Sequence, residues 1–145
     1  MNLETFLRDT SDKIFQQIGS GYPECVYHTI LIREITKVFP NVEREKHVPV
    51  IYIDSEGIPI TVSNVRIDLF ITHVGLNYIV ELKSTNKSTI SCVEKNQVYR
   101  YIDMLQKNYN IDVEESYIIN FPGPTTNTIP DEIMFEKLIK DPKWI

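Results

Sequence analysis

Two acidic residues and one lysine lie inside short apolar segments of this chain. Asp68 falls within the run 65–71, and Glu81 and Lys83 close the run 78–83. Such segments have the composition of buried strands, where a charge is costly unless it has a partner or a function. A carboxylate pair with a nearby lysine is the set of groups that metal-dependent phosphodiester hydrolysis needs. We therefore take these three residues as the candidate chemical centre.

The two segments are predicted to pair as a β-hairpin. A turn at Val74 and Gly75 places Asp68 opposite Glu81, and alternation along the strand puts Glu81 and Lys83 on one face. Two facing carboxylates repel each other unless a cation lies between them, and oxygen ligands of this kind suit Mg²⁺ or Mn²⁺ rather than zinc. The lysine would stabilise charge on a phosphate or help to deprotonate an attacking water. A salt-bridge cluster on a solvated sheet face is the alternative interpretation.

Hydrophobic periodicity predicts the elements that must position this centre. Helical spacing of apolar residues predicts helices over 3–18, 23–39, 90–107 and 131–140. Alternating or apolar runs predict strands over 42–53, 58–62, 65–72, 76–83 and 113–121. Pro49 favours an edge or a bulge in the first strand, and Asp131 would cap the last helix. The expected fold is α/β (α+β), with an antiparallel strand meander between helices, followed by a helix and a strand.

Length, composition and charge limit the class of protein. The chain has 145 residues, 42% of them hydrophobic, so we expect a single domain over 1–145. Its net charge of −5 provides no general attraction for nucleic acid, so any polyanion site must be local. The cysteines are too few for a disulfide framework, the first residues are charged where a signal peptide would be apolar, and no segment has the length of a membrane span. We expect a soluble, intracellular protein that makes no contact with membranes.

Four short motifs resemble those of one nuclease superfamily. Asp68 followed by Glu81-Leu82-Lys83 resembles the PD-(D/E)xK signature, although Ile67 and not proline precedes the aspartate. The segment 21–27 matches the G-x-x-E-x-x-Y motif that names one branch of that superfamily. The segment 97–101 matches the Q-x-x-x-Y of the lambda-exonuclease-like and RecB-like branches, and 119–121 resembles the Ile-Asn-Phe that ends the last core strand. The order of predicted elements is similar to the restriction-endonuclease-like core.

The resemblance implies catalytic and metal-binding roles for the matched residues. Asp68, Glu81 and the carbonyl of Leu82 would ligate the metal, and Lys83 would be the catalytic lysine. Glu24 would reach the metal or its water shell from the second helix. Without the resemblance, Glu24 is an acidic residue in the first turn of a helix, where the helix dipole favours it.

Four further residues would support this centre. Gly21 begins the G-x-x-E-x-x-Y motif, and Tyr27 ends it on the same helical side as the glutamate. The tyrosine is expected to pack and to form a hydrogen bond rather than to react. Gln97 and Tyr101 lie one helical turn apart and would present an amide and a phenol to a phosphate or to the carboxylates. A capping or surface pair is the alternative for these two.

Together, the residues and the resemblance predict a Mg²⁺- or Mn²⁺-dependent nuclease that acts on DNA. Lys87, Lys95 and Arg100 around the third predicted helix would form a local basic rim for phosphates. The Q-x-x-x-Y motif favours the processing of ends or single strands. Two alternatives stay open: a structure-selective resolvase of branched DNA, and a non-catalytic nucleic-acid-binding or scaffold module of the same fold. A domain this small often needs a protein partner or a second copy of itself to grip a duplex.

Overall fold

A computed structural model describes residues 2–86, 89–123 and 132–139 of the chain. These residues form three helices and one five-stranded sheet. The helices are α1 (Leu3–Ile18), α2 (Glu24–Val38) and α3 (Cys92–Tyr109). The strands are β1 (Val42–Ile53), β2 (Pro59–His73), β3 (Leu76–Lys83), β4 (Glu115–Asn120) and β5 (Met134–Leu138). No helix in these ranges is both long enough and apolar enough to cross a membrane.

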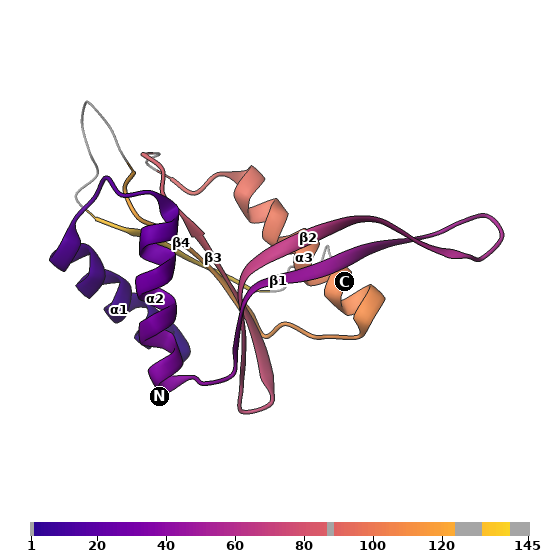
Figure 1. The fold of residues 1–145 in the computed structure, drawn as a ribbon, viewed down its shortest axis with the longest axis horizontal. Helices are drawn as coiled ribbons and strands as arrows, with labels where there is room; N and C mark the ends of the chain where they lie inside the picture. The colour runs from indigo at the N-terminus through magenta and orange to yellow at the C-terminus, as the bar shows by residue number, and fades with distance from the viewer. Residues whose placement is uncertain (1, 87–88, 124–131, 140–145) are drawn as a thin grey trace.

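The strands lie in the sheet in their chain order, from β1 to β5. β1, β2 and β3 form the antiparallel meander that the sequence predicts. β4 pairs parallel to β3 and antiparallel to β5. Parallel neighbours need a long crossover, and α3 with its flanking segments provides it. The predicted α/β fold with a helix, a meander, a helix and a strand is confirmed (Figure 1).

Each face of the sheet has its own hydrophobic core. On one face, Leu69 and Ile71 of β2 pack with apolar residues of α1 and α2 such as Leu31. On the other face, Phe70 belongs to a cluster with residues of α3 such as Leu105. Neighbouring residues of β2 therefore point to opposite faces, as strand geometry requires. The sheet is held between a helix pair and a single helix, with α3 on the side opposite α1 and α2.

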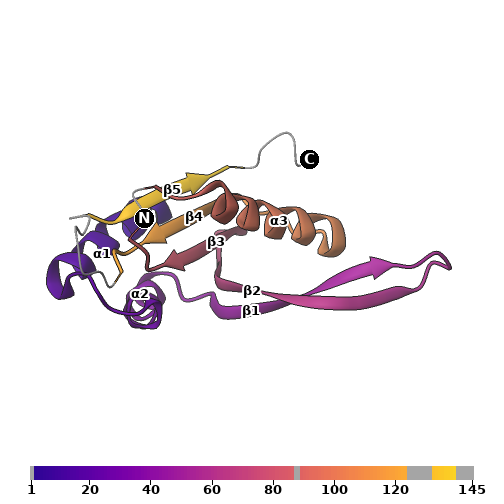
Figure 2. The same ribbon diagram turned by 90° about the horizontal axis from the view of Figure 1, so that it is seen from above.

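β1 and β2 change direction where Glu45 lies opposite Asp68. Glu45 has a φ of 52°, in the left-handed region that a residue with a Cβ enters at a cost. Ile67 and Leu69, on either side of the aspartate, belong to different cores and so to opposite faces. Residues two apart share a face in a regular strand, so β2 twists sharply at Asp68. Beyond the twist, the two strands continue away from the rest of the molecule as a long arm (Figures 1 and 2).

Two predictions about the elements are wrong. The spacing over 131–140 predicts a helix, but residues 134–138 form β5; Asp131 and Lys140 lie outside the described residues. Pairing with β4 satisfies backbone groups that would otherwise form an open sheet edge, and this outweighs helical spacing in so short a segment. The strands predicted over 58–62 and 65–72 are one strand, β2, in which Val62 is the extra residue where the register with β1 shifts between Val50 and Ile51.

Candidate active site

Asp68 and Glu81 lie where β2 and β3 stop pairing through their backbones. The regular register ends with Leu69 opposite Val80, as the predicted hairpin turn requires. At the next step, Glu81 Oε1 accepts a hydrogen bond from the Asp68 N–H at 3.0 Å. Asp68 Oδ2 accepts one from the Leu82 N–H at 2.9 Å. Two carboxylates have thus taken the place of backbone acceptors, which fixes both side chains against the strands.

The carboxyl pair is buried, and its negative charges are close together. Asp68 is 7% exposed and Glu81 is 3% exposed. Burial, and then the neighbouring Asp68 charge, raises the pKa of Glu81 to about 8, against the opposing effects of the Asp68 N–H and of Lys83. Near neutral pH the pair therefore retains a proton. Such a pair is stabilised when a cation replaces the proton.

Lys83 and two residues of α3 complete the centre. The Lys83 ammonium lies 3.5 Å from Gln97 Oε1, at the long limit for a hydrogen bond. It forms no ion pair with any described residue. Burial, followed by the charges of Glu81 and Asp68, raises the pKa of Tyr101 to about 12. The structure thus brings Gln97 and Tyr101 beside the carboxyl pair and the lysine.

Glu24 stands near this centre at the start of α2. The residue as a whole is exposed, but partial burial of its carboxyl raises its pKa. The Asp68 charge raises that pKa further, and Lys83 and Arg66 lower it. Among the described residues, no three His, Cys, Asp or Glu side chains lie close enough together to hold a metal ion. The Glu24 carboxyl thus lies close enough to Asp68 and Lys83 to feel both charges.

Tyr27 ties the loop before α2 to the end of the sheet. Its hydroxyl donates to the carbonyl of Gly19 at 2.8 Å and accepts from the N–H of Tyr22 at 3.3 Å. Its ring stacks on Phe121, with centroids 4.3 Å apart and planes inclined by 4°. Gly21 has a φ of 94°, which favours glycine. Its N–H donates to the carbonyl of Pro122 at 3.1 Å. We name these six residues the Tyr27 corner; they fix the point at which α2 begins.

Two buried polar residues near the centre were not predicted as site residues. Asn120 accepts hydrogen bonds from the N–H and hydroxyl of Thr85 and donates to its carbonyl, at 3.1, 2.8 and 2.9 Å. It pairs with Lys83 across the sheet, so it anchors the chain that leaves β3, and the Ile-Asn-Phe motif could have identified it. His28 is 5% exposed; burial lowers its pKa and Asp68 raises it. Its Nε2 has no hydrogen-bond partner among the described residues.

The basic residues expected to bind DNA lie in different environments. Lys95 is 3.0 Å from Glu136 of β5, so part of its charge is already paired. Arg100 is exposed and forms no ion pair within the described part of the chain. Lys87 lies outside the described residues. Arg100 is therefore the described member of this set that is available to a phosphate.

Comparisons with known proteins agree with this fold. A family model described as the PD-(D/E)XK nuclease superfamily matches residues 3–130. Among solved structures, the chain is similar to the crystal structure of SSO0001, with a TM-score of 0.57 and 18% sequence identity. That similarity covers 79% of this chain and 50% of the other, so this chain spans half of its length, and at this identity it concerns the fold alone. No curated protein matches. Because the family model covers most of the chain, this protein belongs to the PD-(D/E)XK nuclease superfamily.

Proposed function

We propose that this protein is a Mg²⁺- or Mn²⁺-dependent nuclease that hydrolyses phosphodiester bonds of DNA at ends or in single strands. Membership of the superfamily indicates nuclease activity, and its members typically use divalent metal ions. The observation that carries the proposal is the buried Asp68–Glu81 pair, held by strand N–H groups beside Lys83. A purely structural cluster would place the lysine in an ion pair with these carboxylates, which the described residues do not show.

The donor atoms fit a small divalent cation. Asp68 and Glu81 would hold it together with the carbonyl of Leu82. In a strand, the N–H and the carbonyl of one residue point to the same side. The Leu82 N–H donates to Asp68, so the Leu82 carbonyl is also directed toward β2. All of these donors are oxygens, which suits Mg²⁺ or Mn²⁺. When bound, the ion would supply positive charge to phosphate oxygens and a water of lowered pKa.

The remaining residues would position and stabilise the reacting groups. Lys83 is placed to contact a phosphate oxygen as its negative charge grows during attack by water. Gln97 would orient the ammonium through the contact that it already makes. Tyr101 keeps its proton near neutral pH, because its pKa is about 12, and therefore serves as a hydrogen-bond donor rather than as a base. Glu24 would accept a hydrogen bond from the attacking water, or its proton.

The test is cleavage of end-labelled single-stranded, double-stranded and branched DNA and of RNA, with Mg²⁺, Mn²⁺ or chelator. We expect metal-dependent cutting of single strands or ends, lost in Asp68→Asn and retained in Asp12→Asn, which alters an exposed aspartate of α1. Preference for branched DNA would favour the resolvase instead, and cutting of RNA alone would exclude the DNA substrate. Metal binding without cleavage of any substrate would favour the non-catalytic module.

A further inference from the structure

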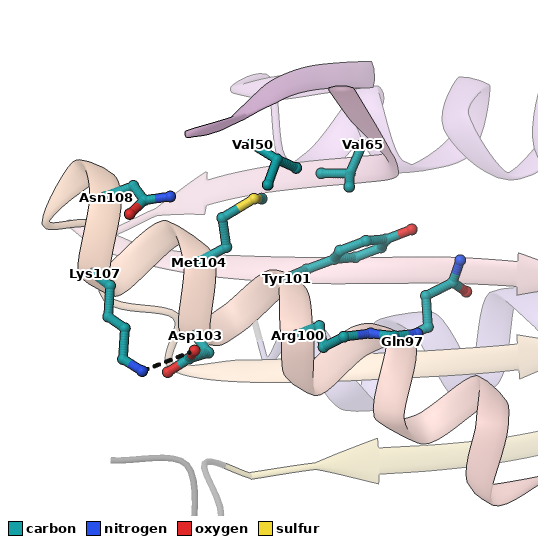
Figure 3. A pocket seen from close by; sticks show the side chains of 9 residues that line it. All are labelled: Val50, Val65, Gln97, Arg100, Tyr101, Asp103, Met104, Lys107 and Asn108. Carbon is teal, nitrogen blue, oxygen red and sulfur yellow. Dashed lines mark ion pairs between the residues drawn. The ribbon is translucent and has the colours of Figure 1, made fainter. Parts of the chain in front are cut away.

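A pocket of about 450 Å³ lies between α3 and the arm formed by β1 and β2. Val50 of β1 and Val65 of β2 form one wall, and Met104 and the ring of Tyr101 form the wall on α3 (Figure 3). Its volume lies within the range of about 300–1,000 Å³ that is typical of small-ligand sites. None of the motifs discussed above accounts for this space, because three of these four residues lie outside them.

One end of the pocket adjoins the candidate active site. Gln97 and Tyr101 line the pocket and also stand beside the carboxyl pair and Lys83. Figure 3 shows the Gln97 amide and the Tyr101 hydroxyl at the same end of the pocket, with Lys107 and Asn108 at the other end. A group that occupies this space is therefore directly beside the position where a phosphate would meet Lys83.

The polar groups of the pocket suit a nucleotide. Gln97 and Asn108 offer amide donors and acceptors, such as base edges require. Arg100 lies on the rim, exposed and without an ion pair to any described residue. Lys107 is 3.2 Å from Asp103, so the rim presents Arg100 as its unpaired cation for a phosphate. The apolar walls match the faces of a base, and the amides match its edges. Arg100, the unpaired cation among the described lining residues, matches the charge of the phosphate.

We infer that this pocket receives one unpaired base of a DNA strand, adjacent to the phosphodiester that is cleaved. The inference rests on the proposed nuclease function and extends it by naming the feature of the substrate that is recognised. A base stacked inside a duplex cannot enter a side pocket without leaving its partner, so the site selects single strands, frayed ends or overhangs. An aliphatic side chain of a protein partner would use the apolar walls but would need neither the amides nor Arg100.

The first test uses the unmodified protein and a series of single-stranded DNA substrates, each with one abasic position. We expect loss of one base next to the cleaved bond to lower kcat/KM by about tenfold or more, with smaller effects at other positions. Uniform cleavage across the series would overturn the inference and would leave the nuclease proposal intact.

The second test fills the pocket and measures binding separately from cleavage. Val65→Trp places a large ring in the pocket, and Val62→Trp is its matched control, because Val62 lies on the same strand, is 59% exposed and does not line the pocket. Oligonucleotides with 2-aminopurine at single positions are bound in the presence of chelator, and their fluorescence is recorded. We expect a change at one position with the wild type and Val62→Trp, and its loss, with weaker binding, in Val65→Trp.

The outcomes separate this inference from the proposed function. Position-specific fluorescence that Val65→Trp abolishes, in a protein that cleaves no nucleic acid, would support the pocket and contradict the nuclease. Cleavage and binding that are equal in Val65→Trp and Val62→Trp would contradict the pocket, as expected if a protein side chain is its occupant. The abasic series needs no variant, so a folding defect in Val65→Trp leaves the inference open to refutation.

Discussion

The Tyr27 corner and the carboxyl centre lie near the same end of the sheet, but their polar groups are satisfied to very different degrees. In the corner, the Tyr27 hydroxyl both donates and accepts, and its ring stacks on Phe121. In the centre, two buried carboxyls are neighbours, and the Lys83 ammonium makes one hydrogen-bond contact with the described residues, at 3.5 Å. A region whose polar groups are all hydrogen-bonded maintains the local structure, whereas a region whose polar groups lack partners can bind a ligand.

This contrast explains how one short motif can serve two purposes. Gly21 and Tyr27, at the two ends of the motif, are used to close the corner. Glu24, between them, is left facing the charges of Asp68 and Lys83. The hydrogen-bonded ends of the motif thus set the position of a carboxyl that faces the centre. Changes in the corner should therefore affect stability, and changes in the centre should affect ligands and activity.

Replacement of Lys83 by alanine should produce the largest effect on activity. We expect kcat/KM for DNA cleavage to fall by at least about 100-fold, because a cation directed at the reacting phosphate is lost. The thermal midpoint should change little, since the ammonium makes no ion pair with the described residues. Steady-state kinetics and circular dichroism melting measure the two quantities.

Lys37→Ala is the matched control for this substitution. Lys37 lies on α2 and is 3.1 Å from Glu34, in an exposed ion pair within the helix. Exposed pairs of this kind contribute about 0–1 kcal/mol, so activity and stability should both stay close to those of the wild type. Equal activity in Lys83→Ala and the wild type would remove the lysine from the proposed mechanism.

The raised pKa of Glu81 predicts an unusual pH dependence of stability. The unfolded protein releases this proton near the ordinary glutamate pKa of 4.5, whereas the native protein keeps it until about pH 8. Between these values the native state binds more protons, so the metal-free protein should lose stability as the pH rises. Mn²⁺ or Mg²⁺ binds the deprotonated pair and should restore stability most strongly at the alkaline end.

Calorimetric melting of metal-free protein at about pH 5, near the lower end of this interval, and at about pH 8.5, above its upper end, measures the dependence. Glu81→Gln cannot release a proton at this position, so its midpoint should change less between the two pH values. Glu34→Gln, at an exposed pair of α2, should behave as the wild type does. A wild-type midpoint that rises steadily across the same interval would show that the carboxyl is ionised throughout.

Loss of the Tyr27 hydroxyl should act on stability instead of chemistry. Tyr27→Phe keeps the stack on Phe121 but removes the bonds to Gly19 and Tyr22. We expect the free energy of unfolding, measured in urea, to fall by about 1–3 kcal/mol, because the partly buried carbonyl of Gly19 loses its hydrogen-bond donor. Cleavage well below the melting temperature should remain within a few fold of the wild type. A large loss of activity without loss of stability would place the hydroxyl in the reaction.

Tyr109→Phe tests whether that cost is specific to the corner. The Tyr109 hydroxyl also donates to a backbone carbonyl, that of Pro49, at 2.7 Å, but in an exposed position. Water can replace an exposed hydrogen bond, so its loss should cost less than the loss at Tyr27.

Local patterns were sufficient to predict the parts of the site that a single hairpin creates. Val74 and Gly75 both have positive φ, at 53° and 73°, which is the geometry of a two-residue type I′ turn. That turn fixes the register and so brings Asp68 to Glu81. The prediction succeeded because every contact involved lies within one stretch of chain.

Features that depend on distant segments could not be predicted in the same way. The segment that forms β5 has the spacing of a helix. Its pairing with β4 leaves no signal in its own sequence, so the strand could not be predicted. For the same reason the ion pair of Lys95 with Glu136 of β5 could not be predicted, and the expected role of Lys95 in binding DNA stays a prediction. The pocket needs Val65 of the arm and Met104 of α3, which are far apart in the sequence and meet only in the folded chain. The twist has no composition signal, because its unusual backbone belongs to Glu45 on the opposite strand.

Replacement of Glu45 by glycine should have the smallest effect on stability, and it distinguishes most sharply between the carboxyl centre and the Tyr27 corner. A left-handed φ costs a residue with a Cβ about 1 kcal/mol, and glycine removes that cost while adding flexibility to the unfolded chain. We therefore expect Glu45→Gly to leave the free energy of unfolding unchanged or to raise it by less than about 1 kcal/mol. Its exposed contact with Arg66, at 3.8 Å, contributes little.

Glu43→Gly is the control in the same strand, because Glu43 is not among the residues with positive φ. There, glycine gains nothing from the native backbone and should lower the free energy of unfolding by about 0.5–1 kcal/mol. Urea unfolding of both variants measures the difference, and equal destabilisation would show that the backbone at Glu45 carries no strain. A difference of the expected sign would mean that the twist beside Asp68 is maintained against a local cost, as expected for backbone that shapes a functional site and unlike the fully bonded Tyr27 corner.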